Sequence, residues 1–174
     1  MKRIALALTV VLALATAPAL AGQATANLAV SASIANNCTI STTALAFGSY
    51  DPIVTHASTP LDGTGTVTIT CTKGATTTMG LGLGSNASGS TRRMTDGSSN
   101  YLSYEAYQPP DNTPGTACSY SSPTVWGASG ANLFTPAAAP SKAARTYNVC
   151  GQVSSGQDLP SGSYTDTVVA SVNF

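Results

Sequence analysis

The first long alternation of apolar and polar residues in the chain covers residues 24–34. Every second position there is apolar, and threonine, asparagine or serine fills most positions between: Ala24, Ala26, Leu28, Val30, Ala32 and Ile34. A period of two is typical of a β-strand with one buried face. Chain ends are usually frayed and polar, so an apolar strand this early raises the question of which sheet receives it.

The same alternation recurs in five later segments. The strongest is 64–71, where Val67, Ile69 and Cys71 share one face and threonines occupy the other. Apolar residues also alternate with glycine or polar residues in 79–83, 101–107 and 146–153. The last segment places on one face Tyr164, Val168, Ala170, Val172 and Phe174. Short strands of this kind predict an all-β sandwich or barrel.

The segments between these strands carry turn chemistry, including Asp62-Gly63, Asp96-Gly97 and Pro160-Ser161-Gly162. No stretch has a sustained helical period. Residues 108–145 are rich in proline, glycine, serine and alanine, and we expect a long loop or an irregular crossover there. No linker divides the remaining chain, which suits one domain.

Residues 1–21 have the pattern of a secretion signal. Lys2 and Arg3 precede an uncharged apolar run, and Ala19-Leu20-Ala21 matches a signal-peptidase site. We expect cleavage after Ala21. The alternative is an uncleaved membrane anchor, for which the apolar run is short.

The charge balance gives no reason to bind nucleic acid. Seven basic residues face seven acidic ones, and only 8% of the chain is charged. Loss of the two basic residues of the leader makes the mature chain slightly acidic, so electrostatics favours neither nucleic acid nor anionic lipid. Serine, threonine, asparagine and glycine supply the polarity, as suits an extracellular β-protein.

The chain has four cysteines, and an even number in an exported protein indicates two disulfides. Four cysteines allow three pairings, of which we favour Cys38–Cys71 and Cys118–Cys150 because both close local loops. The alternative is zinc. No pair has CxxC spacing and the single histidine, His56, lies far from any metal-like cluster, so we expect no metal and no other cofactor.

Candidate chemistry is sparse, and we expect no enzyme. A Ser–His–Asp triad would need His56, the single histidine. His56 lies in a proline-bounded segment that we expect to be a loop, where an isolated exposed histidine is the ordinary case. The scattered carboxylates are better explained as turn caps. We interpret Arg92-Arg93 as a solvated hairpin end rather than a contact site. Trp126 is a sugar-stacking platform or, more commonly in a sandwich, a core residue.

Several landmarks together resemble the spore coat protein U domain family, whose Gram-negative members include subunits of archaic chaperone–usher pili of the Csu type. The resemblance covers about Asn27 to Phe174. It depends on the order and spacing of Cys38-Thr39-Ile40, Leu45 to Asp51, Gly65 to Cys71, Arg93-Met94, Leu102 to Tyr107, Trp126-Gly127 and Gly162 to Val168. The pair Cys118 and Cys150 is not assignable to every member.

The resemblance implies an incomplete immunoglobulin-like β-sandwich that lacks its final strand. A periplasmic chaperone lends the missing strand, and at an outer-membrane usher the N-terminal extension of the next homologous subunit replaces it. The strand of Tyr164 to Phe174 would then face the chaperone or the donor. On this basis we expect a leader (1–21), a donor-strand extension (22–36) and a pilin-like domain (37–174).

Three functions follow as hypotheses. The first is a structural subunit of an extracellular fibre, exported through the periplasm, for adhesion or biofilm formation. The second is a spore or cell-surface coat protein of the same fold without an ordered pilus, and the third is a secreted carbohydrate-binding domain that uses Trp126 and tyrosines. Periodicity alone allows residues 24–34 to be the ordinary first strand of their own domain; the resemblance favours donation.

Overall fold

The computed structural model describes residues 21–174, so the expected leader, apart from Ala21, lies outside the described residues. The chain divides into two units, Met1–Ser33 and Ile34–Phe174. Residues 21–37 contain no strand. In the proposed donor segment the three large apolar side chains, Leu28, Val30 and Ile34, are 87–88% exposed, and donation remains a prediction.

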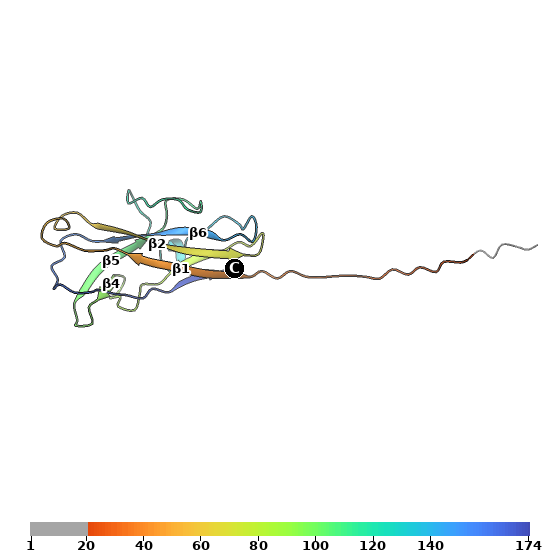
Figure 1. The fold of residues 1–174 in the computed structure, drawn as a ribbon, viewed down its shortest axis with the longest axis horizontal. Coiled ribbons are helices and arrows are strands. Elements are labelled where there is room, and N and C mark those ends of the chain that lie inside the picture. The colour runs from red at the N-terminus through yellow and green to blue at the C-terminus, as the bar shows by residue number, and fades with distance from the viewer. Residues whose placement is uncertain (1–20) are drawn as a thin grey trace, which may run out of the picture. The chain divides into compact units, whose positions relative to one another are not determined.

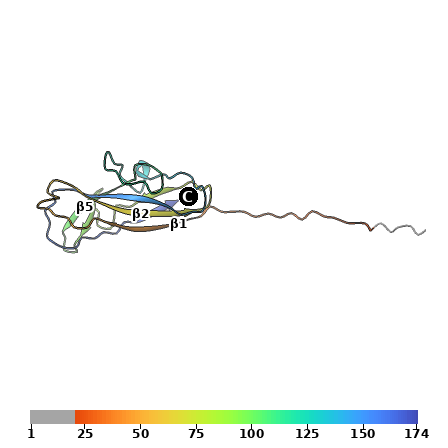
Figure 2. The ribbon, with the colours of Figure 1, turned by 45° about the horizontal axis from the view of Figure 1, so that its top comes forward.

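The larger unit is built on a five-stranded antiparallel sheet. Its strand order is β1-β2-β6-β5-β4, so β1 and β4 are the edges. The bounds are β1 Cys38–Ala46, β2 Leu61–Cys71, β6 Arg145–Val153, β5 Tyr101–Tyr107 and β4 Arg92–Thr95. Figures 1 and 2 show β1 and β2 running alongside each other, with β6 on the far side of β2 in Figure 1.

A smaller sheet pairs β3 (Thr78–Leu81) with β7 (Ala170–Asn173) in antiparallel register, Leu81 opposite Ala170. Phe134 extends it by exchanging two backbone hydrogen bonds with Met79. Apolar side chains from both sheets form one core cluster, which includes Val67, Ile69, Met79, Trp126, Phe134 and Tyr147. Trp126 has no exposed surface and lies 5.1 Å from Phe134, ring centre to ring centre, which confirms its core role.

The all-β class is confirmed, and the clean alternations correspond to strands: 64–71 lies in β2, 101–107 is β5, and 146–153 lies in β6. The last alternation is only partly a strand. Residues 170–173 pair as β7, whereas Thr165 makes one isolated bridge to Thr95. Within residues 21–174 the single helical element is a 3-10 turn, Gly130–Asn132, and no helix could cross a bilayer.

Two disulfides tie distant segments together, in the pairing that the sequence favours. Cys38–Cys71 joins directly opposite residues of β1 and β2, with 4.1 Å between the Cα atoms. Cys118–Cys150 joins the long 108–144 connection to β6, with 5.4 Å between the Cα atoms.

Two predictions about polar residues are wrong. Arg92 is not a solvated hairpin end, because its side chain is fully buried and forms an ion pair with Glu105. His56 is not exposed, because its ring stacks on Tyr50 at 5.1 Å and only 8% of the residue is accessible. In both cases the partner lies elsewhere in the sequence, or on the far side of a turn, where periodicity gives no signal.

Candidate functional site

The most prominent hollow of the domain lies between β1 and the C-terminal segment 157–170. We call it the groove. Its narrow part, of about 380 Å³, lies between residues 42–47 and 164–170, over Val67, Leu81 and Val149. Its wide part, of about 720 Å³, lies between residues 45–53 and 157–164, over Leu61, Leu102 and Val153. Both parts share Leu45, Phe47, Met94 and Tyr164, so they are continuous.

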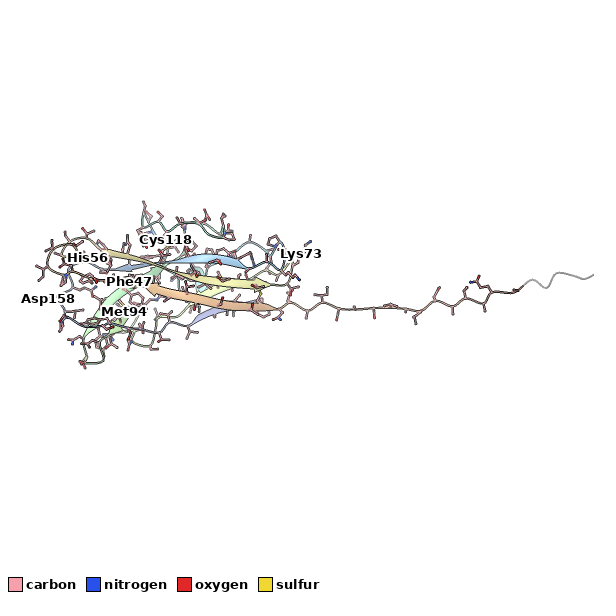
Figure 3. All side chains as sticks on the ribbon, viewed as in Figure 1. Phe47, His56, Lys73, Met94, Cys118 and Asp158 are labelled. Carbon is pink, nitrogen blue, oxygen red and sulfur yellow. A yellow bond between two sulfur atoms is a disulfide. The ribbon has the colours of Figure 1, made fainter. Side chains whose placement is uncertain are left out.

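The groove runs along the domain, from one end toward the other. In Figure 3 His56 and Asp158 lie at one end, Lys73 lies at the opposite end, and Phe47 lies between them. The wide part includes Asp158 and the neighbouring loop residues and therefore opens at the His56 end, which we call the tip. The Lys73 end, which we call the base, holds the start of β1 and the chain end, Phe174.

Both walls of the groove have a free backbone edge. On the C-terminal wall, Thr165, Thr167 and Val169 direct their backbone hydrogen bonds away from the groove, to Thr95, Ser85 and Gly82. Successive residues of an extended chain direct their backbone groups to opposite sides, so those of Asp166 and Val168 face the groove. No backbone group within residues 21–174 bonds to them there.

The opposite wall is the edge strand β1, which pairs only with β2. Its register shifts between Thr43 and Ala46. The inward positions therefore change from Cys38 and Ile40 to Leu45 and Phe47, as expected for a β-bulge.

Glycines on β2 and β6 make room for this shift. A Cβ on Gly151 would lie 2.6 Å from Leu45 and 2.8 Å from Phe47, and one on Gly63 would lie 2.7 Å from Phe47. Leu45 and Phe47 therefore lie directly on a floor of glycine backbone.

Polar residues close the narrow part of the groove beside Asp166. Its carboxylate accepts hydrogen bonds from the Tyr104 hydroxyl at 2.8 Å, and from the backbone and side-chain nitrogens of Asn86 at 3.1 and 3.0 Å. Burial, together with this hydrogen bond, raises the pKa of Tyr104 far above its ordinary value, so the phenol remains a donor. Gly84 has φ +92°, and a Cβ there would lie 1.9 Å from an Asp166 oxygen.

Arg92 joins the walls of the sandwich behind this site. Its guanidinium donates to the carbonyl oxygens of Leu81 at 3.1 Å, Gly82 at 2.9 Å and Trp126 at 2.6 Å, and it pairs with Glu105. One side chain of β4 thus satisfies carbonyl groups at the end of β3 and in the Trp126 segment. This contact keeps the two sheets in register under the groove.

The residues predicted to face the chaperone or the donor lie in three places. Tyr164, Val168 and Ala170 line the groove, Val172 packs against the core beside it, and Phe174 is half-exposed at the chain end. The predicted donor residues are exposed and unpaired, as described above. Sequence reasoning missed the floor of the groove: Leu45, Phe47, Leu61, Met94, Leu102, Tyr104 and Leu159. The alternation in 101–107 indicated two of them as one strand face, and only the fold gathers the rest.

The described residues offer little other chemistry. No three His, Cys, Asp or Glu side chains within residues 21–174 come together as a metal site. Trp126 cannot stack on a sugar, because it is fully buried and its indole N–H donates to Met79 O at 3.0 Å. A polar hollow of about 590 Å³ lies between loops 108–112 and 119–124. Its carboxylate, Asp111, is engaged by Thr113 and Thr116.

The geometry thus identifies an apolar groove with two free strand edges, and comparisons with known proteins bear on it. The family described as Spore Coat Protein U domain matches residues 24–171. The chain is 38% identical over 173 residues to Protein U of Myxococcus xanthus, covering 92% of this chain and 90% of that protein.

A solved structure shares the fold. It is a chain from the CsuC–CsuE chaperone–tip adhesion subunit pre-assembly complex of archaic chaperone–usher Csu pili of Acinetobacter baumannii. The TM-score is 0.55 at 18% identity, and the match covers 81% of this chain but only 40% of that one. At this identity the likeness supports the immunoglobulin-like fold alone. The family match over nearly the whole described chain, with the identity to Protein U, shows that this chain belongs to the spore coat protein U domain family.

Proposed function

We propose that this protein is a structural subunit of a secreted surface fibre, in which the segment 24–34 of each following copy fills the groove of the copy before it. The observation that carries the proposal is the groove itself, because its apolar floor lies between two strand edges with free backbone groups. Such an edge is an aggregation hazard unless a strand covers it, and β-strand addition is the direct way to cover it.

The same chain contains a segment of matching chemistry. Leu28, Val30 and Ile34 alternate with polar residues and are 87–88% exposed. Burial of each could contribute about 1.5–3 kcal/mol, and each added ladder hydrogen bond about 0.5–1.5 kcal/mol. Together these terms suit a long-lived, non-covalent joint. Donation from one copy to the next is heterologous and does not close, so it produces a fibre.

The volumes of the groove suggest the direction of the donor. In the donor segment 24–34, the small residues Ala24 and Ala26 lie at the start, and the large apolar side chains follow them toward the C-terminal end. The wide part of the groove opens at the tip and the narrow part lies toward the base. The donor therefore enters with Ala24 toward the base and Ile34 toward the tip, which is antiparallel to the segment 164–170.

Assembly in this scheme uses further partners. Before polymerisation a periplasmic chaperone covers the groove, and an outer-membrane usher exchanges it for the next subunit. The similar solved structure is that of a chaperone–subunit pre-assembly complex, which supports the chaperone partner. Export through the periplasm would use the leader 1–21, and the final location would be the cell surface, where a fibre serves adhesion or biofilm formation. No catalytic role is part of the proposal.

Deletion of residues 22–34 tests the proposal. The shortened protein, co-produced with its chaperone, should fold, should bind a synthetic peptide of residues 24–34, and should no longer polymerise. A matched peptide with Leu28 and Val30 replaced by aspartate should not bind, since it would bury two carboxylates. If the deletion unfolds the domain and no peptide rescues it, the segment is an ordinary first strand and the proposal is wrong.

The family description favours a second candidate, a coat protein of the same fold without an ordered pilus. Electron microscopy of producing cells separates the two. Thin fibres support the first candidate, and an amorphous layer containing the protein supports the second.

A further inference from the structure

Two large apolar side chains point outward from a loop at the tip. Ile53 and Val54 are 84% and 75% exposed, and they belong to the turn that connects β1 and β2. His56 marks the same loop in Figure 3, at the end of the domain opposite Lys73. The groove does not account for Val54: residues 47–50, Pro52 and Ile53 of this connection line the wide part, whereas Val54 does not.

The loop is firmly built. The Asp51 carboxylate accepts the backbone N–H of Ile53 at 3.0 Å and of Val54 at 3.1 Å, and His56 N–H donates to Asp51 O at 2.8 Å. Below it, the Tyr50 hydroxyl donates to the carbonyl oxygens of His56 and Ser154 at 3.2 and 3.1 Å. A loop held in this way presents its apolar side chains without a large ordering cost on binding.

The covalent tether in the chain limits what can lie over this loop. Only three residues, 35–37, separate Ile34 from Cys38, the first residue of β1. An extended chain spans about 3.3–3.6 Å per residue, so Cys38 lies at most about 14 Å from Ile34. If Ile34 fills the tip end of one groove, the base of the next copy must sit directly against the tip.

We propose that Ile53 and Val54 form a docking surface for the base of the following copy of this chain. The inference rests on the proposed function, because it needs the donor of that copy in the groove. The base offers three adjoining segments: 36–37, 72–74 and 137–140. Backbone hydrogen bonds join them, from Thr72 N–H to Asn37 O at 2.9 Å and from Gly74 N–H to Ala139 O at 2.8 Å.

The chemistry of the two surfaces is compatible. The segment 137–140 exposes Ala137, Ala138 and Pro140 at the base, beside Gly74. Small apolar residues of this kind leave room for the larger Ile53 and Val54. The contact adds a second point of attachment beside the inserted strand, and two points separated in space fix the angle between consecutive subunits.

Site-specific photo-crosslinking of assembled fibres tests the contact. The full-length protein carries p-benzoylphenylalanine in place of Val54, and a matched control carries it in place of Ala117, which is exposed, does not line the groove and is next to Cys118, between the two ends of the domain in Figure 3. Position 54 should give a subunit–subunit adduct several-fold stronger than position 117, mapped by mass spectrometry to 36–37, 72–74 or 137–140. If fibres form without that adduct, or with adducts to another protein only, the docking surface is wrong. The proposal that the donor strand fills the groove is not affected by that result.

The single variant Val54→Ser gives an independent readout, because Val54 does not line the groove. It should polymerise to the same extent as the parent protein, because the groove floor and the donor are unchanged, but its fibres should bend more in electron micrographs. Fibres of the control variant Ala117→Ser should bend as those of the parent protein do. Equal stiffness of all three fibres overturns the inference, and the absence of any polymer from the parent overturns the proposed function with it.

Discussion

Individual polar residues hold this sandwich together where an apolar core would be expected. Arg92 is the clearest case, because it satisfies three carbonyl oxygens and Glu105 from a fully buried position. Removing one partner of a buried ion pair leaves an uncompensated charge and unpaired carbonyl groups.

Arg92→Met should therefore lower the free energy of unfolding by about 3–5 kcal/mol. Arg92→Lys should recover only part of this loss, since an ammonium cannot reproduce the planar set of donors. The single tryptophan, Trp126, is buried, so its fluorescence during urea unfolding reports the loss. Arg93→Met is the control. Arg93 is half-exposed over the Tyr101 ring at 4.1 Å, and its loss should cost about 0.5–1 kcal/mol.

Two features favour glycine at position 84: the positive φ of its backbone and the close approach of the Asp166 side chain. A Cβ at this position would overlap the Asp166 carboxylate, and φ is +92°. Gly84→Ala should lower the melting temperature of the full-length protein more than Gly97→Ala, which has φ +82° but nothing within 4 Å. Both variants carry the backbone strain, so the difference measures the contact with Asp166. Equal losses would show that backbone strain alone accounts for the glycine.

Three aspartates that cap turns make the stability of the folded protein depend on pH in the acidic range. The pKa of Asp51 is lowered by the N–H groups of Ile53 and Val54, that of Asp96 by Asn100 and the Ser98 N–H, and that of Asp111 by Thr116 and the Thr113 N–H. A lowered pKa in the folded state contributes stability above the ordinary value of 3.8. That contribution disappears as the pH falls through the lowered pKa.

The melting temperature should therefore fall as the pH falls below the ordinary aspartate range. The triple variant Asp51→Asn, Asp96→Asn, Asp111→Asn keeps an acceptor oxygen at each turn but cannot titrate. Its melting temperature should change less between neutral and acidic pH. A profile as steep as that of the parent protein would assign the acid sensitivity to other groups.

At the scale of elements, the sequence predicted the strands that have one buried and one exposed face. β2, β5 and β6 lie where the alternation placed them. β4 was missed because its buried position holds Arg92, which a hydrophobic pattern counts as polar. The segment 164–169 was expected as a strand and forms only a bridge at Thr165, since one of its edges has no neighbour. The groove floor comes from five separate segments, and no local pattern could gather them.

The long connection 108–144 is attached to β6 by one disulfide and by hydrogen bonds, including Gly115 N–H to Thr146 O at 2.9 Å and the Asn148 side-chain N–H to Thr116 O at 2.8 Å. Cys118→Ser with Cys150→Ser should leave the sheet in place but loosen this connection, and should cost about 2–4 kcal/mol of stability. Limited proteolysis should then cut within residues 108–124 before any other part of the domain. The Tyr120 hydroxyl also donates to Gly63 O and Gly151 O at 3.1 Å, so Tyr120→Phe in the parent protein is a control with a smaller effect.

At the scale of the whole molecule, the proposed function gives each chain both halves of a joint, a donor segment and a groove, which a pair of copies joined head to tail leaves open at each end. The alternation in 24–34 makes a specific prediction about which side chains enter the groove. Val30→Asp should abolish polymerisation, because it would place a carboxylate on an apolar floor. Ser31→Asp should polymerise normally, because the neighbouring position faces solvent in the inserted strand. Gel electrophoresis without boiling measures both, and equal loss in the two variants would contradict the register.

The disulfide between Cys38 and Cys71 has a mechanical consequence. In a fibre of the proposed kind, a pulling force passes from the inserted segment of a subunit directly into the first residue of β1. A free edge strand loaded at its end separates from its neighbour one hydrogen bond at a time. Because Cys38 is bonded to the residue directly opposite on β2, the load passes at once to a central strand, and the edge cannot be peeled from that end.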